Sequence, residues 1–475
     1  MSKRFVMAAL ALAIAGCSLT PEYQRPEAPV AAAWPKNVKL KLSSKLVRSD
    51  RWQDYFTEPR MRGLIAAALE HNRDLRIATA RIAEARAQYG IQEAGRLPNV
   101  SATAGHSESS SPASTSITGR EFKSQRYDVN ISVVSFELDF WGRVASLSEA
   151  AKANYFATEE AQRAFRLSLI ADVANAYLSV LELRERTRLA AATVKTRARY
   201  RELTDRRREM GVSSDMDTLQ AEGAFQSARA EYASLERQQA AAENLLDLLV
   251  GYPVAQLKDL PSGRSLTLQS IGIAQLAELP AEALLRRPDV RAAEQRLIAA
   301  NANIGAARAA FLPSITLTGS AGTASRTLAG LFDAGSSAWS FQPSLVQPLF
   351  DAGRNEANLD VAEARKVIAV ADYEKTIQQA FREVADLLNA RERLAVQLAA
   401  QQANAAAQGR RLKLVDARYS AGIASYLELL DAQREAFAAW QGALQVRRLQ
   451  LTTATQLYKA LARGTEDGES EAPAP

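Results

Sequence analysis

The chain of 475 residues has one cysteine, Cys17, and two histidines, His71 and His106. A single cysteine excludes an intramolecular disulfide. The two histidines are separated by a proline and a predicted strand, so we expect no metal site. The sequence also lacks a catalytic triad, a metal-ligand cluster and a phosphate-binding loop. We therefore expect a protein that is not an enzyme and that binds no cofactor.

The sequence also has no long block of charges of one sign and few long apolar runs. The formal net charge is +6, but basic and acidic residues are interleaved along the predicted helices. This pattern does not follow a phosphate backbone, so nucleic acid is not an expected partner. After residue 16, no segment has the roughly 18 consecutive apolar residues that a membrane-spanning helix needs.

The first residues have the pattern of a secretory signal peptide. Lys3-Arg4 precedes an apolar run that extends to Ala15. The segment Ile14-Ala15-Gly16-Cys17 resembles a bacterial lipobox, in which the cysteine is lipidated and becomes the first residue of the mature protein. We expect a signal peptide over residues 1–16 and a covalent lipid on Cys17. The alternative is an ordinary signal peptide that happens to contain cysteine.

An extended strap is expected between the lipidated cysteine and the folded part of the chain. Residues 17–60 include prolines at 21, 26, 29 and 35, which favour extended backbone. Several acyl chains suffice to anchor such a strap to a membrane. Ser18, rather than aspartate, follows Cys17, and by resemblance this favours sorting to the outer membrane.

Two proline-free stretches, residues 143–209 and 354–420, dominate the chain. Both are rich in Ala, Leu, Arg, Glu and Gln, with apolar residues at steps of three and four. Each predicts a helix of about 100 Å, too long for a globular domain. A glycine precedes each stretch and another follows it at the same spacing, which predicts an internal repeat of two long helical hairpins. These glycines are Gly142 and Gly211 in the first half and Gly353 and Gly422 in the second.

Each half of the chain also contains two segments in which apolar and polar residues alternate. We expect strands at about 98–106 and 126–138, and at about 313–321 and 338–349. Four strands are too few for a sandwich, and a bacterial barrel has at least about eight. Closure must then come from several copies. A dimer would give about eight strands filled by side chains, and a trimer about twelve with room for a lumen.

The predicted organisation is mainly α with a small β part. The first repeat covers residues 61–250 and begins with a helix from about Met61 to Gly95. The second repeat covers residues 280–463. A connector over residues 251–279, together with the segment before Met61, is expected to form an equatorial region. The acidic tail over residues 464–475 reads as disordered.

The ends of the two helical hairpins have matched turn chemistry. Gly211 and Gly422 can take the left-handed conformation that ends a helix, and a capping box is expected to open each return helix. Helix capping does not explain the apolar residue inside each turn. We therefore interpret the tips as a docking surface for a partner. The alternative is that these residues only end one helix and cap the next. The residues concerned are Gly211, Val212 and Ser214-x-x-Asp217 in the first tip, and Gly422, Ile423 and Ser425-x-x-Glu428 in the second.

Two aspartates, Asp205 and Asp416, lie six residues before the tip glycines. The helix dipole accounts for several of the basic residues around them but not for the acids. In a symmetric trimer each aspartate forms a ring of three charges, which can tie adjacent helices together through arginines and act as a gate. The alternative is solvated surface charge. The basic residues are Arg206, Arg207 and Arg208 in the first half and Arg410, Arg411, Lys413 and Arg418 in the second.

Four segments resemble the outer-membrane efflux lipoproteins of tripartite drug pumps. The resemblance implies a TolC-like homotrimer with a 12-stranded outer-membrane barrel, a long periplasmic helical tunnel and an equatorial region. It also implies a periplasmic adaptor and an RND-type inner-membrane pump as partners. The segments are LLRRPDVRAAEQRLIAANANIGAARAAFLPSITLTGSAG (284–322), WSFQPSLVQPLFDAGR (339–354), RYSAGIASYLELLDAQR (418–434) and CSLTPEYQRPEAPVAAAWP (17–35).

The resemblance assigns roles to residues of both tips. It implies that Gly211, Ser214, Gly422 and Ser425 lie at the periplasmic tip, where the adaptor docks. It places Leu412 and Asp416 near the constriction, and Arg201 occupies the first-half position equivalent to Leu412. The complete set of gate candidates is Leu412, Asp416, Arg418 and Asp205.

Together these features predict a passive exit duct that is anchored by lipid in the outer membrane, extends into the periplasm and exports drugs or other small toxic molecules. A static coiled-coil lipoprotein that braces the cell envelope is a second hypothesis, but it leaves the four alternating strands unused. A third hypothesis is a duct for type I-like protein secretion. The lipobox and the segment at 284–322 favour efflux over secretion.

Overall fold

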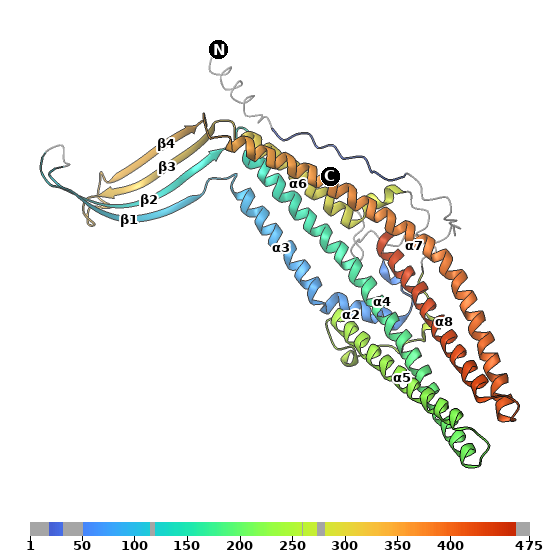
Figure 1. Cartoon of the computed structure of the whole chain (residues 1–475). Helices are drawn as coiled ribbons and strands as arrows, with labels where there is room; N and C mark the ends of the chain where they lie inside the picture. The colour runs from blue at the N-terminus through green and yellow to red at the C-terminus, as the bar shows by residue number, and fades with distance from the viewer. Residues whose placement is uncertain (1–18, 32–50, 115–118, 259, 273–280, 462–475) are drawn as a thin grey trace. The chain divides into compact units, whose positions relative to one another are not determined.

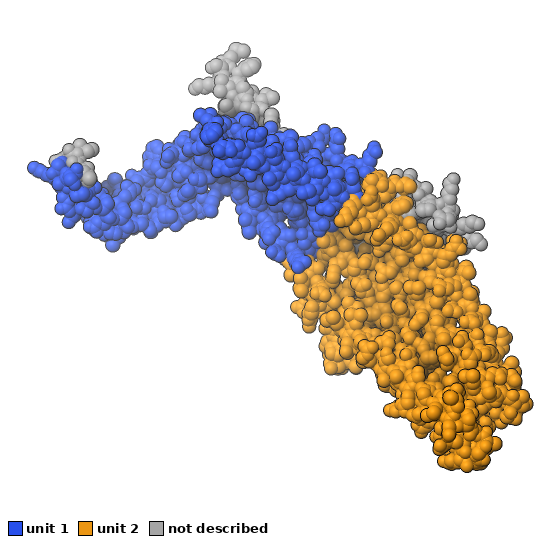
Figure 2. Space-filling view, viewed as in Figure 1, with its two compact units in different colours: residues 1–27, 81–159, 292–374 blue, residues 28–80, 160–291, 375–475 orange. Residues whose placement is uncertain are grey.

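The computed structural model is mainly helical and contains one four-stranded antiparallel sheet (Figure 1). The chain divides into two compact units, which Figure 2 distinguishes by colour. The signal segment, Cys17, part of the strap and the acidic tail lie outside the described residues. The structure describes residues 19–31, 51–114, 119–258, 260–272 and 281–461.

Two helices of 67 residues each, α4 (Arg143–Glu209) and α7 (Arg354–Ser420), are the longest elements. Each continues into a return helix of 36 residues, α5 (Asp215–Val250) after α4 and α8 (Tyr426–Leu461) after α7 (Figure 1). The predicted repeat of two long helical hairpins is therefore confirmed. The predicted first and last residues of each long helix are confirmed as well. The glycines that flank the long helices all have positive φ, as the repeat requires: Gly142 (71°), Gly211 (73°), Gly353 (81°) and Gly422 (76°).

Helix α4 contains an 18-residue window that is long and apolar enough to cross a membrane by length and composition. Of that window, 61% is buried inside the chain. Val173, Tyr177 and Leu178 are buried in the main core of unit 2, where Phe56 and Leu64 also lie. The apolar character of this stretch is therefore explained by core packing.

The predicted single helix from Met61 to Gly95 is wrong, because Asn72 interrupts it. The structure has two helices, α2 (Pro59–His71) and α3 (Arg73–Ala94). Asn72 has an extended backbone, with φ −61° and ψ 129°. Its Oδ1 accepts a hydrogen bond from the Leu75 amide at 2.8 Å, and its Nδ2 donates to the Leu249 carbonyl of α5 at 2.8 Å. Asparagine competes for backbone groups in this way without the proline or glycine that usually marks a break.

The sheet of unit 1 follows the chain order β1-β2-β3-β4. Its rows are apolar on one face and carry hydroxyl groups on the other. Ala102, Ile131, Ala321 and Trp339 form one apolar row, and the adjacent row is Ser101, Ser132, Ser320 and Ser340. The predicted alternation is confirmed. The strands are β1 (Val100–Ser111), β2 (Phe122–Leu138), β3 (Ser314–Ser325) and β4 (Ser337–Val346).

Strands β1 and β3 run further than the sequence predicted, to Ser111 and Ser325 rather than to about residues 106 and 321, whereas β4 ends at Val346 rather than at about residue 349. Ser111 still pairs with Phe122, and Ser325 with Tyr127. Backbone pairing between strands needs no apolar side chain, so the alternation pattern ends before the hydrogen-bonded ladder does. The longer strands place more backbone in the sheet than the sequence pattern indicated.

The two segments expected to form the equatorial region meet in unit 2. Phe56 makes an isolated antiparallel bridge with Ile271 of the connector. Arg62, in the first turns of α2, donates to the carbonyls of Phe56 and Gln53 at 2.5 and 2.6 Å. The connector also contains the short helices η2 (Val254–Gln256) and η3 (Leu266–Leu268), and η5 (Ala281–Arg286) precedes α6 (Pro288–Ala309).

We predict that Asn72→Ala lowers the free energy of unfolding by about 1–2 kcal/mol, because it removes a helix cap and a contact with α5. Thermal denaturation of the protein in detergent, followed by circular dichroism, measures the change. Asn389→Ala, at an exposed position of α7, is the matched control. Equal melting temperatures for the two variants would contradict the assigned role of Asn72.

Candidate functional site

The candidate site is the pair of tips at which α4 turns into α5 and α7 turns into α8. In the first tip the Val212 amide donates to the Arg207 carbonyl at 2.8 Å, and in the second the Ile423 amide donates to the Arg418 carbonyl at 2.8 Å. These are the long backward bonds of a helix end with a left-handed glycine. The backbones of Val212 and Ile423 therefore close the turns.

The side chains of the same two residues have no comparable structural role. Val212 is 73% exposed and Ile423 is 70% exposed. The apolar residue that follows such a glycine frequently packs back on its own helix. Here both side chains face outward. Helix termination therefore explains the backbone of each tip but not why the residue after each glycine is apolar.

The two return helices begin differently, although their sequences match. In the first tip the capping box is complete, because Ser214 accepts from the Asp217 amide and Asp217 accepts from the Ser214 amide. In the second, Ser425 accepts from the Glu428 amide at 3.2 Å, while the Glu428 carboxylate accepts from Arg418 at 2.6 Å. The predicted second box is thus only half formed, because the arginine is a stronger, charged partner for the carboxylate.

A small apolar core joins the two hairpins just behind the tips. Ala221 of α5 is buried with Val415, Tyr419, Tyr426 and Leu429 of the second hairpin. Leu412 and Tyr200 pack against the edge of this core and are half-buried. The gate candidate Leu412 therefore contributes to packing between helices within one chain.

Asp416 is bound by a residue that the sequence analysis did not select. The Tyr200 hydroxyl of α4 donates a hydrogen bond to Oδ1 of Asp416 on α7. Burial raises the pKa of Tyr200, and the hydrogen bond to Asp416 raises this pKa further, so the tyrosine stays a neutral donor. Tyr200 is the only aromatic residue between residues 178 and 209. An isolated aromatic residue in a long polar helix was the one sequence feature that could have indicated its role.

Four of the arginines that were expected to pair with the two aspartates bind other acids within the chain. Arg207 lies over the Tyr419 ring, 4.9 Å from its centroid. Asp205 is half-buried and has no ion pair with any residue that the structure describes. The chain therefore does not join the aspartates to the predicted arginines. The ion pairs formed instead are Arg206–Glu202, Arg208–Asp215, Arg411–Asp431 and Arg418–Glu428.

The tips lack the features of a chemical centre. Within the described ranges, no three His, Cys, Asp or Glu side chains gather in an arrangement that would hold a metal ion. The tips have two exposed apolar side chains, Val212 and Ile423, on helical hairpins that are held together by a small core. Such a surface is suited to contact with another protein.

Residues 64–252 and residues 279–463 each match the family described as "Outer membrane efflux protein". The two matches fall on the two repeats. The chain is 43% identical to the toluene efflux pump outer membrane protein TtgF of Pseudomonas putida, over 99% of both chains. It is 43% identical to the outer membrane protein OprJ of Pseudomonas aeruginosa, over 97% of this chain and 96% of that protein.

A solved structure agrees with these relatives. The open-state MtrE outer membrane channel of Neisseria gonorrhoeae has a TM-score of 0.82 and 40% identity. That match covers 94% of this chain and 98% of the MtrE chain. The structural similarity thus covers nearly the whole of both chains.

Proposed function

Because this chain belongs to the outer membrane efflux protein family, we propose that it is the exit duct of a tripartite system that exports small toxic molecules. Members of this family are transport channels, which are not enzymes. The observation that carries the proposal is the near full-length similarity to outer membrane components of efflux pumps, combined with two long hairpins that end in exposed apolar tips. Neither a protein-secretion duct nor a static envelope lipoprotein has comparable support.

Three copies of the chain close the barrel. The described sheet pairs β1 and β4 on one side only, so its two edges offer unpaired backbone groups. A bilayer cannot satisfy these groups, and closure with neighbouring copies removes both edges. Apolar side chains on β4, including Trp339 at 78% exposure, fit a surface in contact with lipid.

The tips dock to a periplasmic adaptor that connects the duct to an RND-type inner-membrane pump. Val212 and Ile423 are the apolar anchors of this contact, and Gly211 and Gly422 fix the turns that present them. Ser214 and Ser425 cap the helices that follow. Interfaces draw most of their binding energy from a few such residues.

We expect the double variant Val212→Ser/Ile423→Ser to weaken adaptor binding at least about tenfold, since it removes two apolar anchors that the adaptor would bury. Drug sensitivity of cells should rise, while the outer-membrane level of the protein stays constant. Crosslinking to the adaptor and drug susceptibility measure these effects. Leu248→Ser/Leu268→Ser is the control, because it removes two side chains that are also exposed, at 73% and 66%. Normal efflux and crosslinking in the tip variant would exclude the docking role.

The hydrogen bond between Tyr200 and Asp416 holds the resting duct closed. It connects α4 to α7 near the tip, where Leu412 and Arg418 also lie. Breaking it leaves the apolar core around Leu429 to hold the ends of the two hairpins together. Asp205 forms no ion pair with any residue in the described part of the chain. It contributes to the gate through contacts with neighbouring copies.

Conductance in planar bilayers tests the gate. Tyr200→Phe and Asp416→Asn should each raise the passive conductance, and the double variant should add little, because both single changes remove the same contact. Asp416→Arg should raise it as well, with no adaptor present. Additive effects of the two single changes would contradict a shared contact, and unchanged conductance in all variants would exclude the gate.

Cys17 bears the covalent lipid that anchors the strap to the outer membrane. The support is the single cysteine at lipobox spacing, since Cys17 itself lies outside the described residues. We expect Cys17→Ser to abolish incorporation of a radiolabelled fatty acid and to reduce outer-membrane delivery, while the protein still folds. Undiminished label on the variant would refute lipidation at this position.

A further inference from the structure

The strap binds to one face of α6 in unit 1. Arg25 Nε donates to Glu294 at 2.6 Å, and Asn301 Nδ2 donates to the Pro21 carbonyl at 2.7 Å. Gly305 allows this approach, because a Cβ at that position would lie 2.1 Å from Thr20 Oγ1. At about 100° per residue, Asn301 and Gly305 lie within about 20° of Glu294 around the helix axis. Residues 294, 301 and 305 therefore define a strap face.

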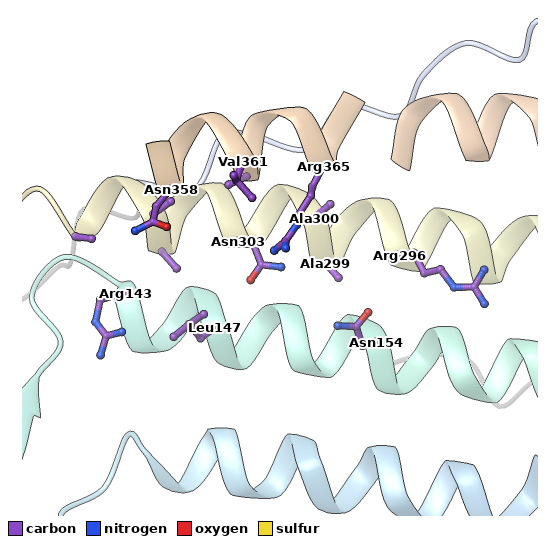
Figure 3. A pocket seen from close by; sticks show the side chains of 14 residues that line it. Arg143, Leu147, Asn154, Arg296, Ala299, Ala300, Asn303, Asn358, Val361 and Arg365 are labelled. Carbon is purple, nitrogen blue, oxygen red and sulfur yellow. The ribbon is translucent and has the colours of Figure 1, made fainter. Parts of the chain in front are cut away.

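The opposite face of α6 lines a pocket. Asn303 lies about 180° from Glu294 around the axis, and Arg296 lies within about 20° of that direction. The pocket has a volume of about 540 Å³ and is formed by α4, α6 and α7 (Figure 3). This volume is within the usual range for a site that binds a small molecule. Every residue that lines it belongs to unit 1.

The polar groups of the pocket are cationic or neutral. Arg143 is neutralised, because its Nε and Nη2 donate to the two carboxylate oxygens of Glu137 at 2.8 and 2.5 Å. Arg296 and Arg365 form no ion pair with any residue in the described part of the chain. Asn303 adds an amide to the lining, and Figure 3 shows Arg365 reaching from α7 toward α6 beside Asn303, with Arg296 further along α6. The pocket thus offers two guanidinium groups without a counter-ion.

Small apolar side chains form the remainder of the lining. Ala299 and Ala300 of α6 line the pocket together with Leu147 of α4 and Val361 of α7. Alanine leaves the room that creates the cavity, and the leucine and valine give it an apolar wall. A ligand that satisfies both parts has one anionic head and a small apolar body. Guanidinium groups suit a carboxylate, which they can bind through two parallel hydrogen bonds.

We propose that this pocket faces the interior of the duct and binds organic anions that have a carboxylate and a small apolar body. The direction rests on the proposed function. Cys17 lies three residues before Thr20, so a strap that joins the lipid must run along the outside of the duct wall. The face of α6 opposite the strap is then the inner face. Each copy of the chain contributes one such pocket to the passage.

A binding experiment tests the site without requiring transport. Full-length protein in detergent is titrated with 4-fluorobenzoate, and binding is followed by fluorine NMR. Arg365→Gln should weaken binding about tenfold, because a charged hydrogen-bond partner is lost. Arg296→Gln should weaken it in the same direction. Equal affinity of the wild type and both variants would overturn the proposal.

Arg308→Gln is the matched control. Arg308 belongs to the same helix and pairs with Glu363 at 3.5 Å, and it lies on the strap side of α6, about 40° from Glu294. Its replacement removes the same charge and should leave the affinity for 4-fluorobenzoate unchanged. The neutral analogue 4-fluorobenzamide should bind much more weakly than the carboxylate. Equal binding of the two compounds would also overturn the proposal.

Ion selectivity tests the direction that the pocket faces. In planar bilayers under a potassium chloride gradient, Arg365→Gln should lower the chloride-to-potassium permeability ratio at least about twofold, because inner-wall charges set the local ion concentrations. Arg308→Gln should leave the ratio unchanged. An open pore with equal ratios in both variants would overturn the inward direction and leave the duct intact. If the wild type formed no pore, the duct itself would be refuted, and the carboxylate site would still be decided by the NMR titration.

Discussion

The two open edges of the four-stranded sheet set the requirement on which the rest of the structure depends. Strands β1 and β4 each pair on one side only in the described chain, and a membrane offers no hydrogen bonds to their outer sides. The sheet must therefore be completed by other copies. The apolar row through Ile131 and Trp339 and the hydroxyl row through Ser132 and Ser340 then become the two faces of one closed wall.

The order of the elements is the same in the two halves of the chain. Each pair of strands is followed in the sequence by a long helix and its return helix. The matched glycines at the tips end both long helices after 67 residues. Within each chain the Tyr200–Asp416 bond and the core around Leu429 hold the two hairpins together. The exposed Val212 and Ile423 are then free to meet a partner.

Periodicity made most of the fold predictable from the sequence. The helices 143–209 and 354–420 and the four alternating strands were recognised because each repeats one spacing many times. Asn72 was missed because its two hydrogen bonds reach Leu75 and a carbonyl 177 residues away, and no local pattern encodes the second. The partner of Asp416 was missed for the same reason, since Tyr200 lies on another helix. Competition between Ser425 and Arg418 for Glu428 likewise depends on tertiary distance.

Closure of the sheet between copies is the central claim, and the mass of the intact protein in detergent tests it most directly. Light scattering with correction for bound detergent gives that mass, and circular dichroism confirms that the helices are intact. The account predicts three chains per particle, because twelve strands leave a lumen whereas eight are filled by side chains. A stable monomer or dimer with full secondary structure would contradict it.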